Sequence, residues 1–385
     1  MNPYRAALSL AVLSLACGGD GRVVSRDPLS LPPSACAPCH KAIVESHART
    51  AHALTSAPAA RATILGDFTE GKNVLHTRSP FVSFTMEARP EGFFQHARDV
   101  TRNLDRMERF DLVVGSGRRG QTYLYWKDAI LYELPVSYLT ATNGWINSPG
   151  YRDGEVDFGR VITTRCLECH ATSFLAVRTD SGLRYDTQRF QLGISCEKCH
   201  GDARQHVAWH TAHPADTVAH DIVNPAKIDR DLRMDVCALC HSGGRPQRTA
   251  SFTYRAGERL DKYLASHPDT ATALPDVHGD QVGLLRRSKC FRSSPNMSCS
   301  TCHDVHTVQR DPDVLSGKCL QCHQAERHTP LPAGTTIALA RCATCHMPVQ
   351  RSHALQINTA TSQDAFSMRT HRIAVYPLDS IGAIR

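Results

Sequence analysis

The pattern Cys-x-x-Cys-His occurs seven times in this chain and constrains its fold more than any other feature. Two thiols three positions apart can add to the two vinyl groups on one edge of a porphyrin, and the histidine that follows then lies under the iron as the proximal ligand. Sixteen cysteines and 21 histidines placed at random in 385 residues would give far fewer than one such match. The sequence therefore predicts seven covalently bound haem c groups.

The motifs are numbered 1 to 7 in chain order. The predicted thioether cysteines are Cys36, Cys39, Cys166, Cys169, Cys196, Cys199, Cys237, Cys240, Cys299, Cys302, Cys319, Cys322, Cys342 and Cys345. The predicted proximal iron ligands are His40, His170, His200, His241, His303, His323 and His346. No catalytic side chain is predicted.

Other uses of paired cysteines explain the pattern less well. A zinc site needs four ligands and does not place a histidine directly after every second cysteine. A thioredoxin-like dithiol occurs once, at the start of a helix in a βαβ unit. A disulfide framework suits an exported chain, but it would not explain seven histidines in register. Haem attachment is the reading that accounts for both residue types.

The first residues predict export. Residues 1–17 contain one arginine and then an apolar run too short to span a bilayer, which is typical of a signal peptide. Cys17 belongs to no motif and is a candidate for acylation, which would attach the chain to a membrane. Ser14 stands where the lipoprotein pattern prefers leucine, so ordinary cleavage nearby, for instance after Gly18, is the alternative. We expect a periplasmic or cell-envelope protein.

The spacing of the motifs divides the chain into unequal parts. A long stretch between motifs 1 and 2 holds most of the β signal: Phe81–Met86 alternates, and Gln121–Trp126 and Ala129–Leu134 flank Lys127-Asp128 like a hairpin. The expected divisions are a signal (1–17), a tether (18–35), a motif 1 segment (36–62), a β-rich segment (63–160), a haem-dense region (161–348) and a C-terminal segment that wraps over the haems and carries a distal ligand (349–385).

These divisions predict a mainly irregular, short α-helical multihaem cytochrome with a small antiparallel β segment between haems 1 and 2. One longer helix is expected at Ala256–Ser266. Aromatic content is only 6%, so the haems should supply much of the apolar core. The chain without haem is therefore expected to be largely unfolded.

The formal charge of +7 on the polypeptide by itself suggests a polyanion partner, but the charges of the haem groups must be included. Each haem brings two propionates, so the holoprotein should be near neutral or acidic. The pairs Arg118-Arg119 and Arg286-Arg287 are expected to bind propionates or to lie in solvated loops. We therefore predict redox proteins, and no nucleic acid, as partners.

Fourteen histidines outside the motifs could supply the sixth iron ligands. His47 and His52 follow motif 1 closely enough for a short helix to carry them to an iron. His306 follows His303 by three residues and could reach an adjacent haem, and His206 is similarly placed after motif 3. Met347 is held beside a proximal histidine, so we expect histidine ligation and low reduction potentials.

Several longer segments resemble the multihaem cytochromes of the c-552/4 group, which includes the tetrahaem cytochrome c-554 and relatives of hydroxylamine oxidoreductase. The matching features are CAPCH followed by SHARTAH, GSGRRGQTYLY, CEKCHGDARQH, MSCSTCHDVH, and CATCHMP with a final THRI. The resemblance implies distal iron ligands at His47, His52, His206, His278, His306, His353 and His371. It also matches Cys290 to a recurring cysteine, either a buried thiol or a sulfur near an iron or a substrate.

The leading functional expectation is electron transfer through closely packed haems that mostly have two histidine ligands. The alternative is a multihaem oxidoreductase with one five-coordinate haem, acting on nitrite, hydroxylamine or a sulfur oxyanion. All seven motifs end in histidine, whereas some enzymes of the group carry lysine there, which favours the carrier. A third possibility is a docking subunit whose β segment binds a partner oxidoreductase.

Overall fold

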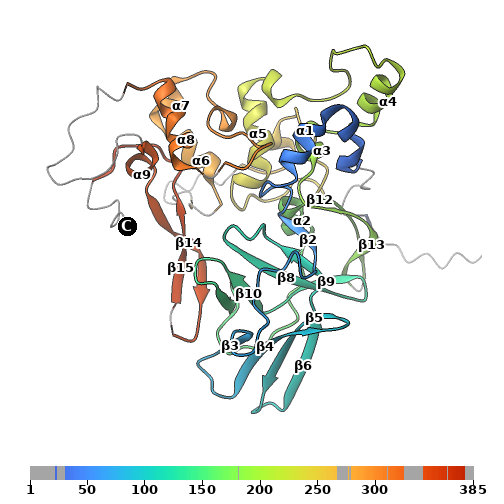
Figure 1. Cartoon of the computed structure of the whole chain (residues 1–385), viewed down its shortest axis with the longest axis vertical. Helices are drawn as coiled ribbons and strands as arrows, with labels where there is room; N and C mark the ends of the chain where they lie inside the picture. The colour runs from blue at the N-terminus through green and yellow to red at the C-terminus, as the bar shows by residue number, and fades with distance from the viewer. Residues whose placement is uncertain are drawn as a thin grey trace, which may run out of the picture.

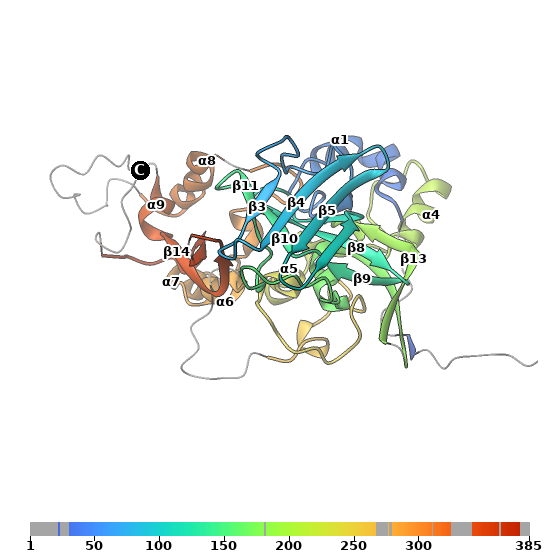
Figure 2. The ribbon, with the colours of Figure 1, turned by 90° about the horizontal axis from the view of Figure 1, so that it is seen from below.

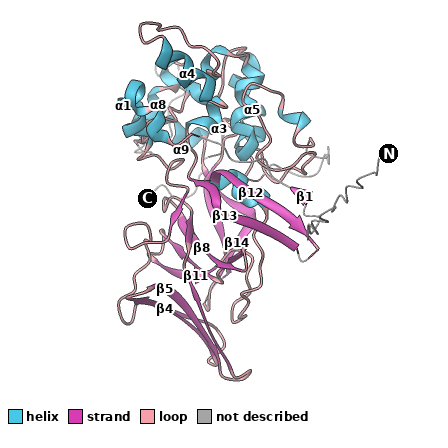
Figure 3. Ribbon diagram, turned by 90° about the vertical axis from the view of Figure 1, so that its right-hand side faces the viewer, coloured by secondary structure: helices cyan, strands magenta, loops and turns pink. Residues whose placement is uncertain are grey.

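The computed structural model describes residues 22–23, 31–180, 182–266, 276, 279–309, 311–324, 341–361 and 363–377. The predicted signal, Cys17 and the distal candidate His278 lie outside these residues. Within them, helices gather at one end of the molecule and most strands at the other (Figures 1 and 3). In this part of the chain no helix is both long enough and apolar enough to cross a membrane.

The strands farthest from the helices form a four-stranded antiparallel sheet in the order β3-β4-β5-β6. Its members are β3 (Val74–His76), β4 (Val82–Arg89), β5 (Gly92–Asp99) and β6 (Leu104–Arg109). In β4 the side chains of Val82, Phe84 and Met86 are buried and those between them are not, so one face packs inward. This strand covers the alternating segment that the sequence predicted.

A second antiparallel sheet packs against the first, in the order β11-β10-β8-β7-β2, with β9 paired to β8. Its members are β2 (Ser56–Pro58), β7 (Leu112–Val114), β8 (Gly120–Lys127), β9 (Ile130–Glu133), β10 (Val136–Leu139) and β11 (Gly144–Asn147). Asp128 and Ala129 join β8 to β9 with φ of 51° and 60°, as a tight hairpin requires. The predicted hairpin is confirmed, with its turn one residue later than the expected Lys127-Asp128.

The two sheets enclose a core of their own. Fully buried aromatic rings of Phe84, Phe110 and Tyr123 lie in it, and Phe110 stacks on Tyr123 at 4.4 Å. Figure 2 shows the β4–β5 layer lying across β8 and β10. Burying each large side chain stabilises the fold by roughly 1.5–3 kcal/mol. Apolar side chains, and not cofactors, therefore hold this region together.

The prediction of a mainly irregular, short α-helical fold is wrong. The described residues are about 26% helix and 28% strand. Strands also occupy regions expected to lack them: β12 (Ala171–Thr179) and β13 (Gly182–Leu192) follow motif 2, with β1 (Arg22–Val23) at their edge, and β14 (Val349–Asn358) pairs with β15 (Gln363–Arg369) in the C-terminal segment. Phe174 and Tyr185 pack this third sheet against β8 and β9. This tertiary packing stabilises the paired strands, and the local sequence pattern did not reveal it.

The helices are short and lie mostly around the motifs. The α-helices are α1 (Ala37–His47), α2 (Thr164–His170), α3 (Cys196–His200), α4 (Arg204–Ala212), α5 (Arg230–His241), α6 (Gln281–Arg286), α7 (Lys289–Ser293), α8 (Pro312–Gly317) and α9 (Cys342–His346). The 3₁₀ turns are η1 (Pro33–Ala35), η2 (Pro225–Lys227), η3 (Leu260–Lys262), η4 (Cys299–Thr301) and η5 (Cys319–Gln321). The helix predicted at Ala256–Ser266 is wrong, because only the single turn η3 forms there.

Candidate haem-binding sites

Each motif is shaped by about one turn of helix. In motif 1 the His40 N–H donates to the Cys36 carbonyl at 2.9 Å, and motifs 5 and 6 repeat this bond at His303 and His323. The bond spans four residues, so it closes one helical turn. A single turn of this kind places both thiols and the imidazole of a motif near one another, as covalent attachment to one porphyrin requires.

Several motif-bearing helices lack a protein core. No residue is buried in α1, α3 or α9, and Ile43 of α1 is 48% exposed. Short helices are not stable in water without packing. These helices therefore fit a role in which bound apolar groups supply the surface that side chains do not.

Four proximal histidines face a second histidine at a common distance. The ring centroids are separated by 6.5 Å for His40–His206, 6.1 Å for His200–His306, 6.2 Å for His52–His241 and 6.2 Å for His303–His371. With metal–nitrogen bonds of about 2 Å and each centroid about 1 Å behind its nitrogen, two imidazoles on opposite sides of one metal have centroids roughly 6 Å apart. The donor set at motifs 1, 3, 4 and 5 fits an iron held by two histidines.

The candidate second ligand of motif 3, His306, has two histidine neighbours. His306 faces His200 with nearly parallel rings, 21° apart, while His47 lies 6.4 Å from His306. Burial lowers the pKa of His47, with smaller contributions from His306 and His200. His306 follows motif 5 in the chain but faces the proximal histidine of motif 3, so it links two motifs distant in sequence.

Hydrogen bonds orient several of these rings. The Nδ1 atom of His200 donates to the Val223 carbonyl at 2.8 Å, that of His206 to the His220 carbonyl at 2.8 Å, and that of His346 to a backbone carbonyl at 2.9 Å. A carbonyl can only accept, so the proton sits on Nδ1 and the Nε2 lone pair is left for a metal.

Burial keeps two of the distal candidates neutral. Desolvation, together with the nearby His241, lowers the pKa of His52 to about 4. Desolvation, together with His303, lowers the pKa of His371 to about 4. Neutral imidazole is the form that binds a metal, so both rings are ready ligands at neutral pH.

Cysteines of different motifs lie side by side. Cys36 lies close to Cys196, Cys169 to Cys240, Cys237 to Cys299, and Cys319 to Cys342. Cys302 of motif 5 also interacts with Cys322 of motif 6. Motif 1 therefore lies beside motif 3, motif 2 beside motif 4, motif 4 beside motif 5, motif 5 beside motif 6, and motif 6 beside motif 7.

Two other predicted residues are placed differently. His353 lies on β14 with an exposed side chain, and its backbone N–H donates to the Asp276 carboxylate at 2.7 Å. Cys290 lies half-buried on α7, near Cys302 and Cys319 of motifs 5 and 6.

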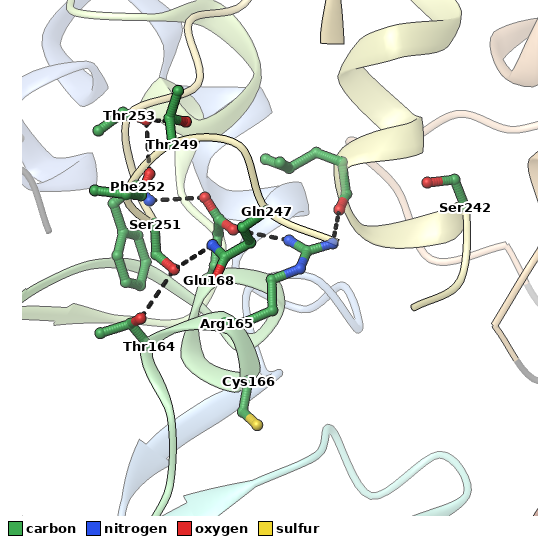
Figure 4. Close-up of polar contacts among 12 residues, drawn as sticks. Thr164, Arg165, Cys166, Glu168, Ser242, Gln247, Thr249, Ser251, Phe252 and Thr253 are labelled. Atoms are coloured by element: carbon green, nitrogen blue, oxygen red, sulfur yellow. Dashed lines mark hydrogen bonds and ion pairs between the residues drawn. The ribbon is translucent and has the colours of Figure 1, made fainter. Parts of the chain in front are cut away.

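Sequence reasoning missed the charged residues inside and beside the motifs. Glu168 occupies the third place of its motif, CLECH, and is 3% exposed, while Lys198 of CEKCH donates to the Thr172 carbonyl at 3.4 Å. Arg165 immediately precedes motif 2 and pairs with Glu168 (Figure 4). The sequence shows the two charges, but their burial depends on segments distant in the chain, such as Phe252.

The motifs, the paired imidazoles and the helices without a core define a multihaem c-type cytochrome with covalently bound haem c. Consistent with this class, residues 152–201 match the family model described as cytochrome c554 and c-prime.

Two kinds of relative are also similar. The C-type polyheme cytochrome OmcB of Geobacter sulfurreducens, in strains DL-1/KN400 and ATCC 51573/DSM 12127/PCA, is 23% identical over 173 residues, which are 43% of this chain and 20% of that protein. The match thus spans about a fifth of the curated relatives' length. The crystal structure of the outer cell wall cytochrome OcwA shares the fold, with a TM-score of 0.55 and 16% identity over 89% of this chain and 79% of that one.

Proposed function

We propose that this chain is an exported electron carrier that binds seven haem c groups, most of them through two histidines. The observation that carries the proposal is that the motifs are neighbours in space. Motif 1 lies beside motif 3, and motifs 2, 4, 5, 6 and 7 each lie beside the next one in that order. In motif 3, Lys198 interacts with Cys240 and Cys199 interacts with Cys237, and both cysteines belong to motif 4. Motifs 1 and 3 therefore adjoin the series formed by the other five motifs. Such a run suits transfer over a distance that no single site could span.

When bound, each haem iron supplies one-electron exchange between its ferric and ferrous states. At the motifs where a second histidine faces the proximal one, the residues of this chain favour electron transfer over substrate binding. His206, His52 and His371 face the proximal histidines of motifs 1, 4 and 5 and fill the position that a substrate would need. Hydrogen bonds from Nδ1 to backbone carbonyls hold the rings of His200 and His206 in place, so little rearrangement accompanies a change of charge.

Export is supported by the signal-like residues 1–17 and by the similar proteins, one of which is an outer cell wall cytochrome. We place the chain in the periplasm or cell envelope, with Cys17 as the candidate lipid anchor. Its partners would be donor and acceptor proteins. Within multihaem cytochromes, the CHDVH and CHMP segments favour the c-552/4 group.

Two measurements test the proposal. Pyridine haemochrome analysis with intact mass should give seven haems per chain. The ferric spectrum should be low-spin and unchanged by nitrite, and the spectrum of the reduced protein should be unchanged by carbon monoxide. Fewer haems would overturn the count. A high-spin fraction that binds nitrite or hydroxylamine would overturn the carrier and favour the oxidoreductase with one five-coordinate haem.

A further inference from the structure

A buried ion pair is built into motif 2. The Arg165 Nη1 atom lies 2.8 Å from the Glu168 Oε2 atom, and the two side chains are 22% and 3% exposed (Figure 4). Both residues lie on α2, one turn apart, so the short helix presents them together. The pair is screened from water far more than an ordinary surface salt bridge.

The same two side chains tie motif 2 to the segment around motif 4. Arg165 Nη2 donates to the Leu239 carbonyl, inside motif 4, at 2.8 Å. The other oxygen of Glu168 accepts from the Phe252 N–H at 2.7 Å. Ser251 adds a third link, since its hydroxyl donates to Thr164 Oγ1 at 3.0 Å at the start of α2. The pair therefore lies at the junction of motifs 2 and 4, whose Cys169 and Cys240 are in contact.

The backbone at this junction is strained to complete the contact. Phe252 has a φ of 64°, a conformation that bulky residues rarely adopt. Its N–H reaches Glu168 in this conformation, and its ring lies 4.6 Å from the Lys198 Nζ atom of motif 3. Strained residues persist where the surroundings over-determine them, commonly at functional sites.

Stability alone gives little reason for the pair. Burying two charges carries a desolvation penalty, and well-packed apolar residues of similar volume often serve as well. What apolar residues cannot supply is fixed charge. A haem gains one electron on reduction, with no bond made or broken, so a buried positive charge beside it favours the reduced state and a buried negative charge opposes it.

We propose that Arg165 and Glu168 form a charge-balance pair in which each charge keeps the other from shifting the reduction potentials of the haems at motifs 2 and 4, in addition to holding these motifs together. The inference rests on the proposed electron-transfer function. The two opposite charges largely offset one another, and loss of either partner leaves an excess of the other sign beside the haems, although Lys198 also interacts with Glu168. Both are positioning residues, because neither is an iron ligand.

The test compares two single variants and the double variant of the full-length holoprotein with the wild type. The reduction potentials are measured by a spectroscopic redox titration with dithionite and ferricyanide. Glu168→Gln should raise the potential of at least one haem, because Arg165 is left uncompensated. Arg165→Gln should lower it. Each shift should reach about tenfold in the one-electron equilibrium constant, or about 59 mV. The double variant should lie close to the wild type.

Opposite signs are the decisive feature. A purely structural role would open the junction to water in both single variants and move the potentials in the same direction. That result would overturn the proposal, as would unmoved potentials in variants that keep their haems. Arg165→Lys retains the positive charge but loses the planar guanidinium group. Its reduction potentials should therefore stay nearer to those of the wild type than the potentials of Arg165→Gln, and an equal shift in the two variants would also contradict charge balance.

A matched control is available in the β region. Glu108 on β6 pairs with Arg106 at 2.8 Å, far from the helical end of the molecule (Figure 1). Glu108→Gln removes the same charge and should leave every potential unchanged. Haem content and the low-spin spectrum are measured on every variant: failure of these in the wild type would refute the proposed function, whereas intact haems with no potential shift would refute only the pair.

Discussion

Replacing His52 by alanine should leave one haem iron without its second histidine ligand and should not change the ligands of the other irons. The His52 ring centroid lies 6.2 Å from that of His241, so the midpoint where a metal would sit is about 3 Å from each ring. The methyl group of alanine would lie behind the position of the lost ring, too far back to touch this midpoint. The neutral imidazole, with its pKa lowered to about 4, is therefore replaced by an open position.

The expected magnitude follows from the number of motifs. With seven haems, about one seventh of the ferric low-spin signal should become high-spin, and the reduced protein should bind about one carbon monoxide per chain. Electron paramagnetic resonance and a carbon monoxide titration measure these two quantities. The fold should survive, because the His52 carbonyl still accepts from the Ile194 N–H at 2.9 Å.

A matched control uses a histidine on the β region. His96 on β5 bonds to Glu87 at 2.9 Å and Asp105 at 2.6 Å, and no motif is involved. His96→Ala should leave all haems low-spin. If His52→Ala also stays fully low-spin and binds no carbon monoxide, then the ring distance does not report ligation and the other three pairs lose their support.

Three further predictions follow from packing. Phe174→Ala removes a fully buried ring and should lower the free energy of unfolding by about 3–5 kcal/mol, measured by chemical denaturation. Gly193→Ala would place a methyl 2.3 Å from the Ala53 carbonyl at a φ of +68°, so it should displace the loop that carries His52 and produce partial high-spin character in the ferric spectrum; an unchanged spectrum would contradict this coupling. Chain made without haem attachment should lose far-ultraviolet helical signal while keeping the β signal and a protected β core in hydrogen exchange, because that core contains only side chains; uniform loss of both would contradict it.

The last of these predictions departs from the sequence-based expectation of a largely unfolded chain. That expectation followed from low aromatic content averaged over the whole sequence. The aromatic side chains are in fact concentrated, since Phe110, Tyr123 and Trp145 pack in one cluster. Composition reports an average, and an average conceals a local core.

Local chemistry made other features predictable. The β8–β9 hairpin was visible because alternating residues flank a turn that accepts left-handed backbone at Asp128 and Ala129. The β12–β13 pair was not visible, because its stability comes from Phe174 packing on Phe190 at 4.9 Å and on a distant sheet. Strand preference depends on neighbours that a local pattern does not contain.

The sequence alone determined the covalent chemistry of this protein, because two thiols and an imidazole at fixed spacing satisfy one porphyrin edge within a single helical turn. Only the tertiary structure decided which histidines face one another. His306 lies three residues from His303 in the chain yet faces His200, about a hundred residues earlier. It likewise placed the Arg165–Glu168 pair against motif 4. Partners of this kind are chosen by how the chain folds back on itself, which spacing within a motif cannot specify.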